Sequence, residues 1–347
     1  MIEYMEAILL TAPGSADHFQ QAMLPLPTPQ PDEVRIRIHA AAFNPMDFQK
    51  RKAATLSQLP MILGGEVAGT IDAVGAAVTT FAVGDLVMAY LVRKPGGYAE
   101  YVCVQALFVV RKPANLSCAQ AAAVPVVGLT AYQAIVTRAA VRPGDAVLIT
   151  GASGGVGTMA IQLARLQGAE RIVVTAGSDQ SARYLTEQLG IAPSQIVRYQ
   201  GLSRAELAAA ALRCNRGQFF RVAMDFVGGA MTSLCSDVVA VEGHVVSIFS
   251  GPRDATHGEP ENDEDRLFDK SAIFHFLLLS ARAVYGPPAS WEIYAQQLAV
   301  LAQRLADGQL QPPLIRDLGR LSVATVRTAH QLLEDGHVQG KLVMTMG

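Results

Sequence analysis

The chain has 347 residues, which is longer than a chain that folds around a single hydrophobic core usually is. Half of the residues are hydrophobic and 17% are charged. This balance predicts two globular domains and excludes a disordered or fibrous protein. The formal net charge is −2 and there is no basic tract, so we expect neither nucleic acid nor an anionic membrane as a partner.

The cysteines are scattered along the sequence, at Cys103, Cys118, Cys214 and Cys235. Without a short pair spacing they predict neither a disulfide framework nor a structural zinc knuckle, and they suit a reducing compartment. The N-terminus lacks the basic start of a signal peptide, and no apolar stretch has the length of a membrane span. We therefore expect a cytoplasmic protein.

The first third of the chain has the pattern of short strands and turns. Residues 33–40 alternate polar and apolar side chains, and residues 67–75 and 85–90 are further β-like runs. The Gly96-Gly97 pair predicts a turn into a strand at 98–102. Short strands with frequent glycine indicate a small β-barrel-like domain.

The pattern changes after residue 117. Residues 117–141 are helical in character, and strands then alternate with helices. This alternation predicts a parallel sheet covered on both faces. The expected strands are 146–150, 171–175, 220–225 and 244–249, and the expected helices are 156–167 and 181–189.

The last part of the chain mixes both kinds of element. We interpret the polar, acidic residues 258–270 as a surface loop and residues 281–285 as a β-like segment, followed by helices at 291–306 and 323–334. The chain closes with a strand at 341–344, whose natural partner is the N-terminal β domain. Apolar segments within 273–285 could pair across a two-fold axis as an extended sheet, which predicts a homodimer.

The strongest local signal is a glycine-rich turn at residues 151–157. An apolar strand precedes it and an amphipathic helix follows, as dinucleotide binding requires. Gly154 and Gly157 take the second and third places of the G-x-G-x-x-G fingerprint, but Ala152 stands at the first. Glycine lets the backbone approach a diphosphate, and the helix N-terminus offers free N–H donors.

The end of the next strand indicates which dinucleotide is bound. NAD sites carry an acidic residue there, whereas this chain has Gly177 and Ser178. Ser178 can donate to a phosphate and Arg183 could neutralise it, although Asp179 opposes this and Arg183 could simply be a solvated helix charge. We expect NADPH, with NADH as the alternative.

Several segments together resemble the medium-chain dehydrogenase/reductase superfamily, and specifically its zinc-independent quinone oxidoreductase branch. They cover nearly the whole chain in the family's order. Besides the glycine turn they are AAFNPMD at 41–47, LGGEVAG at 63–69, GGYAEY at 96–101, AVP at 123–125, GLTAY at 128–132 and GKLV at 340–343.

The resemblance implies an α/β fold of two domains with the cofactor between them. One is a GroES-like β-rich catalytic domain, expected at residues 1–121 and 287–347. The other is a Rossmann domain with a doubly wound parallel sheet, expected at 122–286.

The resemblance also implies the site residues. It places Asn44 near the nicotinamide ribose or the substrate carbonyl. We expect the proton to come from water; Asp47 and Tyr98 are candidate donors, but a structural hydrogen-bonding role is favoured for both. The expected cofactor-binding residues are Asn44, Thr130, Ser153, Gly154, Gly155, Val156, Gly157, Ser178, Arg183, Tyr199 and Phe249.

Two departures bear on the chemistry. Asn44 and Gly65 stand where metal-using relatives carry a cysteine and a histidine, and the four-cysteine lobe is absent, so we expect no zinc. Gln49 stands where many quinone reductases have a tyrosine, which leaves the substrate class open.

These features predict an NADPH-dependent reductase of a small quinone, enone or similar activated carbonyl. Without a Lewis acid, oxidation of an alcohol is difficult at neutral pH, and reduction of an activated acceptor is easier. The alternatives are an alcohol dehydrogenase or carbonyl reductase of the same fold, and a non-catalytic NADPH-binding sensor or structural protein.

Overall fold

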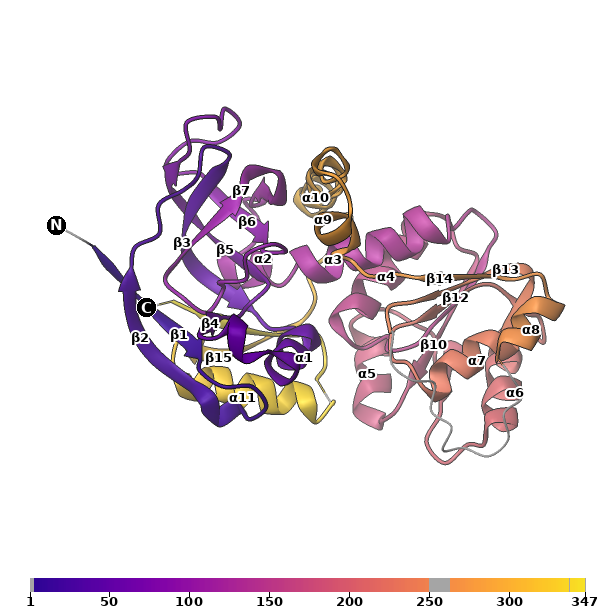
Figure 1. The fold of residues 1–347 in the computed structure, drawn as a ribbon. Coiled ribbons are helices and arrows are strands. Elements are labelled where there is room, and N and C mark those ends of the chain that lie inside the picture. The colour runs from indigo at the N-terminus through magenta and orange to yellow at the C-terminus, as the bar shows by residue number, and fades with distance from the viewer. Residues whose placement is uncertain (1–2, 250–262, 337, 347) are drawn as a thin grey trace. The chain divides into compact units, whose positions relative to one another are not determined.

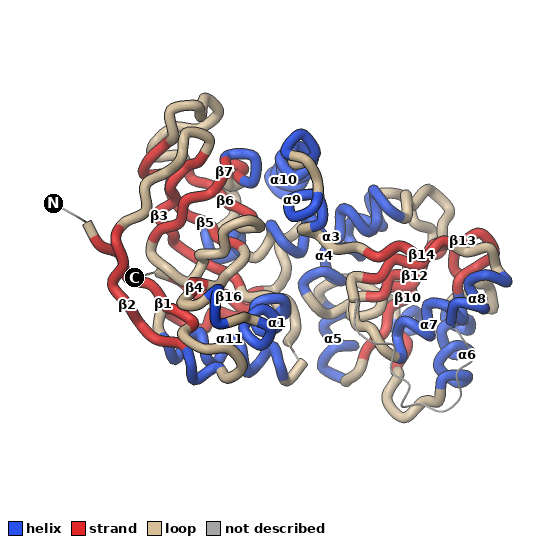
Figure 2. Tube along the Cα trace, in the orientation of Figure 1, coloured by secondary structure: helices blue, strands red, loops and turns tan. Residues whose placement is uncertain are grey.

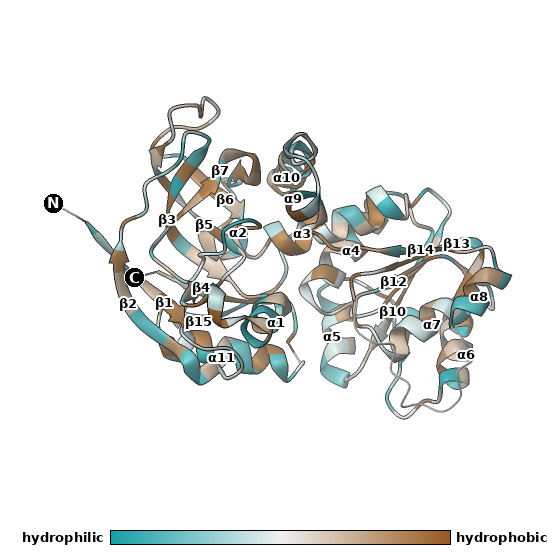
Figure 3. Ribbon diagram, viewed as in Figure 1, coloured by the Kyte–Doolittle hydropathy of each residue, from teal (hydrophilic) through white to brown (hydrophobic). Residues whose placement is uncertain are grey.

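The computed structural model describes residues 3–249, 263–336 and 338–346. The chain divides into two compact units, residues 1–129 with 280–347 and residues 130–279. The strands of the second unit carry mostly hydrophobic residues, while helices such as α5 (Asp179–Glu187) and α11 (Val323–Glu334) carry both kinds (Figure 3). This is the pattern of helices that bury one face against a sheet.

The first unit is built on mostly antiparallel β structure, with β15 and β16 as a parallel pair (Figures 1 and 2). Its larger sheet has the order β15-β16-β3-β5-β6-β8, with β7 also paired to β3, and its smaller sheet has the order β2-β1-β4. The strands are β1 (Tyr4–Leu10), β2 (Phe19–Pro25), β3 (Glu33–Ala42), β4 (Met61–Ile62), β5 (Glu66–Val74), β6 (Leu86–Tyr90), β7 (Tyr101–Gln105), β8 (Val109–Arg111), β15 (Ile315–Arg320) and β16 (Lys341–Thr345).

The expected β-rich domain is confirmed. Strand β16 pairs antiparallel with β3, with Val343 opposite Ala42, so the closing strand does lie in the N-terminal sheet. The strand expected at residues 98–102 starts later, at Tyr101, because the residues before it pair with β1 instead: the Ile8 N–H donates to the Tyr98 carbonyl and the Glu100 N–H to the Glu6 carbonyl. The helices of this unit are α1 (Pro45–Ala53), α2 (Cys118–Ala122), α9 (Ala281–Tyr285), α10 (Glu292–Ala306) and α11, and α3 (Pro125–Tyr132) crosses the boundary between the units.

The second unit is a six-stranded parallel sheet in the order β11-β10-β9-β12-β13-β14. Numbered from β9, this is 3-2-1-4-5-6, the order of a dinucleotide-binding Rossmann fold, so the expected doubly wound sheet is confirmed. The strands are β9 (Ala146–Ile149), β10 (Arg171–Ala176), β11 (Ile196–Arg198), β12 (Phe220–Asp225), β13 (Val239–Ser247) and β14 (Ile273–Phe276).

Helices cover the parallel sheet. Residues of α6 (Arg204–Cys214), α7 (Ala230–Val238) and α8 (Asp263–Asp269) form one core with Leu148, Val173 and Ala223. Helix α4 (Gly155–Leu166) lies on the opposite side of the sheet (Figure 1) and is joined to α5 by a hydrogen bond between the Thr158 and Tyr184 hydroxyls. Strand β13 begins at Val239 and ends at Ser247, so the strand expected at 244–249 was placed too late.

Two expected elements are wrong. The surface loop expected at 258–270 contains α8, while residues 258–262 lie outside the described residues. Three acidic residues occupy the first turn of α8, where they suit the positive end of the helix dipole, and Leu267 is buried against the sheet. Residues 281–285, expected as β-like, form helix α9, in which Ala283 is buried while Val284 and Tyr285 are exposed.

Candidate functional site

Each unit carries its own group of candidate site residues. In the second unit, β9 runs into the glycine turn and then into α4. Gly151 has a φ of +61°, and Gly154 is the N-cap of α4. Gly151 thus provides the tight turn that the fingerprint assigns to its first glycine, one position before Ala152.

The start of α4 is suited to an anion. No side chain caps this helix, so the backbone N–H groups of Gly155, Val156 and Gly157 have neither an intrahelical nor a capping acceptor in the described turn. A Cβ on Gly157 would lie 2.4 Å from the Gly151 carbonyl oxygen, whereas one on Gly154 would lie at an ordinary 3.4 Å. The turn is therefore closed tightly at Gly157 and accessible at Gly154, and its residues fit a diphosphate.

The end of β10 carries two further expected residues. Ser178 is the N-cap of α5, and its hydroxyl accepts the N–H of Ser181 at 3.1 Å. The Tyr199 side chain lies over Gly177, where a Cβ would come within 2.3 Å of the tyrosine hydroxyl. The structure thus places Tyr199 at the end of β10. The expected residue Ser178 lies two residues beyond this end and is the N-cap of α5.

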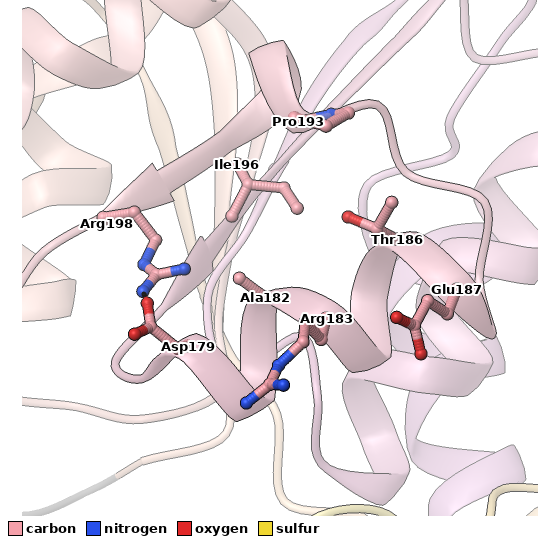
Figure 4. A pocket seen from close by; sticks show the side chains of 8 residues that line it. All are labelled: Asp179, Ala182, Arg183, Thr186, Glu187, Pro193, Ile196 and Arg198. Carbon is pink, nitrogen blue, oxygen red and sulfur yellow. Dashed lines mark hydrogen bonds and ion pairs between the residues drawn. The ribbon is translucent and has the colours of Figure 1, made fainter.

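A hollow of about 610 Å³ lies between α5 and β11 (Figure 4). Both Arg183, which was expected to bind the cofactor, and Arg198 line it, and Arg198 forms an ion pair with Asp179. Sequence reasoning missed Arg198, although it directly precedes Tyr199. The hollow is therefore lined by two guanidinium groups and by two carboxylates, those of Asp179 and Glu187, which oppose their positive charge.

The other expected residues of this unit lie near the ends of the central strands. Thr150 accepts the N–H of Phe226 at 3.1 Å, which ties the end of β9 to the end of β12. The Phe249 ring packs over Gly228, where a Cβ would come within 2.5 Å of the ring. The β9–β12 boundary is the point where the strand order reverses, the usual ligand position in such sheets. Ser153 lies inside the glycine turn, and Thr130 is buried in α3.

In the first unit, Asn44 and Asp47 lie together at the start of α1. The Asn44 N–H donates to Asp47 Oδ2 at 2.8 Å, and both residues are buried. Burial raises the pKa of Asp47 to about 6, and nearby Glu66 adds to this, whereas the Asn44 hydrogen bond, Lys50 and Lys341 act in the opposite direction.

The Asn44 side chain contacts two buried charged groups. Its Nδ2 donates to Glu66 Oε1 at 2.9 Å, and its Oδ1 accepts from Lys341 Nζ at 2.6 Å. Lys341 Nζ also donates to Glu66 Oε1 at 2.6 Å and to the Phe43 carbonyl oxygen at 2.9 Å. The other carboxylate oxygen of Glu66 accepts the Val126 N–H at 2.7 Å. No role was assigned to Glu66 or Lys341 from the sequence, although they lie in the LGGEVAG and GKLV segments that carry the family resemblance.

Tyr98 lies deeper in the same unit. Its hydroxyl is 3.1 Å from His330 Nε2, and burial raises its pKa. Burial, helped by the nearby Arg51 cation, lowers the pKa of His330 to about 3, so this imidazole is neutral. A fully buried pair of this kind favours the structural reading of Tyr98. Gln49 is exposed on α1.

The donor chemistry around Asn44 does not fit zinc. The Lys341 ammonium occupies the side of Asn44 Oδ1 and Glu66 Oε1 that a metal would need, and its charge repels a cation. In the part of the chain that the structure describes, no three histidine, cysteine or acidic side chains gather as a metal-ligand set. His244 and His275 form a pair with 2.9 Å between ring nitrogens, without a third ligand among those residues.

The β-rich unit contains a buried polar cluster, and the Rossmann unit contains an uncapped glycine turn. Together these features are typical of a nucleotide-dependent oxidoreductase. The alcohol dehydrogenase GroES-like domain model matches residues 30–114, and the zinc-binding dehydrogenase model matches residues 194–344. The chain belongs to the medium-chain dehydrogenase/reductase superfamily, whose members use nicotinamide cofactors.

Three relatives illustrate this membership. A chloroplastic quinone-oxidoreductase homolog of Spinacia oleracea is 32% identical over 249 residues, which is 69% of this chain and 73% of the relative. A 2-methylene-furan-3-one reductase of Solanum lycopersicum is 34% identical over 228 residues, 59% of this chain and 58% of the relative. The structure of a quinone oxidoreductase from Coxiella burnetii is 28% identical with a TM-score of 0.79, and the match covers 99% of this chain and all of that one.

Each helix among the described residues is too short or too polar to traverse a bilayer.

Proposed function

We propose that this oxidoreductase is a zinc-independent, NADPH-dependent reductase of a quinone, enone or similar activated carbonyl. The observation that carries the proposal is the buried Asn44 amide, held between Glu66 and Lys341 where metal-using relatives have a zinc ligand. Such a site offers a hydrogen-bond donor to an oxygen but no Lewis acid. The quinone-reductase and furanone-reductase relatives support the same substrate class.

The reduction assigns a role to each part of the site. A bound reduced nicotinamide supplies the hydride. The uncapped N–H groups of α4 bind the diphosphate, and Thr130, Tyr199 and Phe249 contact other parts of the dinucleotide. When hydride adds to the β-carbon of an enone, the C=C electron pair moves toward the carbonyl oxygen, and the Asn44 N–H stabilises the negative charge that develops there. A proton from water then reaches the α-carbon and gives the saturated ketone.

NADPH is proposed over NADH because of the residues beyond β10. This strand is followed by Gly177 and Ser178 rather than by a carboxylate in the position that holds a ribose 2′-hydroxyl. Arg183 and Arg198 provide two cations beside it, and a guanidinium binds a phosphate through paired, charge-assisted hydrogen bonds. Two carboxylates of the hollow oppose this preference: Asp179 forms an ion pair with Arg198, and Glu187 also lines the hollow.

The test is a binding and turnover assay on the full chain. We expect NADPH to bind about tenfold or more tightly than NADH, since one charge-assisted hydrogen bond contributes roughly 1.5–3 kcal/mol. We expect NADPH oxidation with enones or quinones, little with the matching saturated ketones, and no loss of rate after treatment with a zinc chelator.

Other outcomes favour the rival functions. Oxidation of alcohols that a chelator abolishes would indicate a zinc-dependent alcohol dehydrogenase. Tight NADPH binding without turnover of any acceptor would indicate a sensor. Absence of affinity for either reduced dinucleotide would overturn the proposal altogether.

A further inference from the structure

We propose that Lys341 is a positioning residue for this reduction: together with Glu66 it fixes the orientation of the Asn44 amide, so that the second Nδ2–H of Asn44 is the donor to the substrate oxygen. The inference rests on the proposed function and assigns its hydrogen bond to one atom. It follows from the direction of four buried hydrogen bonds.

The two charged partners of Asn44 determine which way its amide faces. An ammonium group only donates hydrogen bonds, so the atom 2.6 Å from Lys341 Nζ is the amide oxygen. An ionised carboxylate only accepts them, so the atom 2.9 Å from Glu66 Oε1 is the amide nitrogen. A flipped amide would place N–H against ammonium and oxygen against carboxylate, which are both repulsive. The orientation is therefore fixed by charge.

This orientation leaves one donor. The amide nitrogen carries two N–H groups, and Glu66 takes one of them. The other has no acceptor among the residues that the structure describes, and the amide oxygen is already bound to Lys341. Asn44 can therefore offer a substrate a hydrogen-bond donor, which is the group that a developing enolate oxygen needs.

Lys341 also strengthens this donor. A cation on the amide oxygen draws electron density from the nitrogen and makes the remaining N–H a better donor. The effect is larger where water is excluded, and Asn44, Glu66 and Lys341 are all buried, with exposed fractions of 3%, 0% and 4%. The Phe43 carbonyl and Glu66 hold the ammonium in place, so its position does not depend on Asn44.

The test is a double-mutant cycle with Asn44→Ala and Lys341→Met. Loss of one preorganised donor to an oxyanion costs on the order of 10²-fold in kcat, and we expect each single variant to lose about that much with NADPH affinity nearly unchanged. We expect the double variant to be no worse than Asn44→Ala, because Lys341 acts through Asn44. Lys341→Arg should recover part of the rate, since it keeps a charged donor.

Lys112→Met is the matched control. The Lys112 ammonium also donates to two backbone carbonyls of the first unit, those of Pro113 and Leu116, but it contacts none of the cluster. We expect its kcat to stay at the wild-type value. If the losses of Asn44→Ala and Lys341→Met multiply in the double variant, Lys341 acts independently of Asn44 and the proposal is wrong.

A second measurement does not depend on turnover. In protein labelled with ¹⁵N-asparagine, the side-chain signal that disappears in Asn44→Ala belongs to Asn44. We expect slow solvent exchange of the Nδ2 proton that Glu66 accepts in the wild type, exchange about tenfold or more faster in Lys341→Met, and no change in Lys112→Met. Unchanged exchange in Lys341→Met would overturn the positioning role.

The two measurements separate the proposals. If the wild type reduces no acceptor, the proposed function fails while amide exchange still decides whether Lys341 orients Asn44. If Lys341→Met does not fold, Glu66→Gln replaces it in both measurements, because it keeps the shape of Glu66 and removes its charge. Its kcat and exchange should change in the same directions.

Discussion

Asp47 illustrates how a single buried carboxyl affects stability. Its pKa rises from the usual 3.8 to about 6, chiefly because burial disfavours the charged form. A raised folded pKa means that the folded state binds the proton more tightly than the unfolded state. The resulting stabilisation is therefore complete below about pH 4 and is lost as the pH rises through 6.

Asp47→Asn should remove this dependence. An amide oxygen can still accept the Asn44 N–H, but it carries no charge to bury. We expect the free energy of unfolding of the variant, relative to the wild type, to increase by up to about 3 kcal/mol between pH 4 and pH 8. Chemical denaturation of both proteins at the two pH values measures this change.

The control for this prediction is Asp17→Asn, which removes a carboxylate from an exposed position. Its relative free energy of unfolding should change much less over the same range. A difference between Asp47→Asn and the wild type that stays flat from pH 4 to pH 8 would show that the carboxyl is not destabilised by burial.

At the scale of an element, the turn before α4 separates two roles of glycine. A Cβ on Gly157 would lie 2.4 Å from the Gly151 oxygen and 2.5 Å from Ala152 Cα, both backbone atoms that cannot move aside cheaply. We expect Gly157→Ala to destabilise the second unit by about 1–3 kcal/mol and to lower its thermal unfolding temperature by several degrees. NADPH affinity should fall as well, because the turn opens.

Gly154→Ala is the matched comparison. Its Cβ would lie 3.4 Å from the same oxygen, an ordinary contact, so the unfolding temperature should hardly change. The new methyl group would nevertheless stand at the N-cap, where the backbone faces a bound diphosphate. We expect weaker NADPH binding with a normal unfolding temperature. Equal unfolding temperatures for the two variants would contradict the assignment of Gly157 to packing.

The sequence predicted elements well where the signal is local. The strand, glycine turn and helix around Gly154 follow one another within about twenty residues, and periodicity identified helix α11 with its bounds. Helices α8 and α9 were missed because each is short. Their few residues cannot display a helical period, and an acidic cluster or a small apolar run looks the same in a loop or a strand.

The candidate site shows the same limit. Asn44 and Asp47 are three residues apart at the start of one helix, so a single sequence motif was enough to predict that they lie close together. Lys341 lies 297 residues from Asn44 and reaches it only because β16 pairs with β3. The position of a strand in a sheet is a tertiary property, and so the orienting charge could not be derived from the sequence alone.

At the scale of the molecule, the free edge of the parallel sheet carries exposed apolar side chains. Strand β14 pairs with β13 on one side, and its other edge has no partner strand among the described residues. Ile273, Phe276 and Leu278, in or just beyond this strand, are 48%, 66% and 53% exposed. An unpaired edge with such side chains invites pairing with another chain.

We expect a second copy to cover this edge across a two-fold axis, which joins two β14 strands antiparallel into one continuous sheet. Only residues 273–276 of the expected segment 273–285 are available for this pairing, because 281–285 form α9.

The wild-type mass in solution should be about twice 36.9 kDa. Phe276→Glu should yield monomers, since two-fold symmetry brings two new charges to the same edge. Leu56→Glu, at a 78% exposed position of the first unit, should remain dimeric. Light scattering after size-exclusion chromatography distinguishes these masses, and a Phe276→Glu protein that stays dimeric would place the interface on another surface.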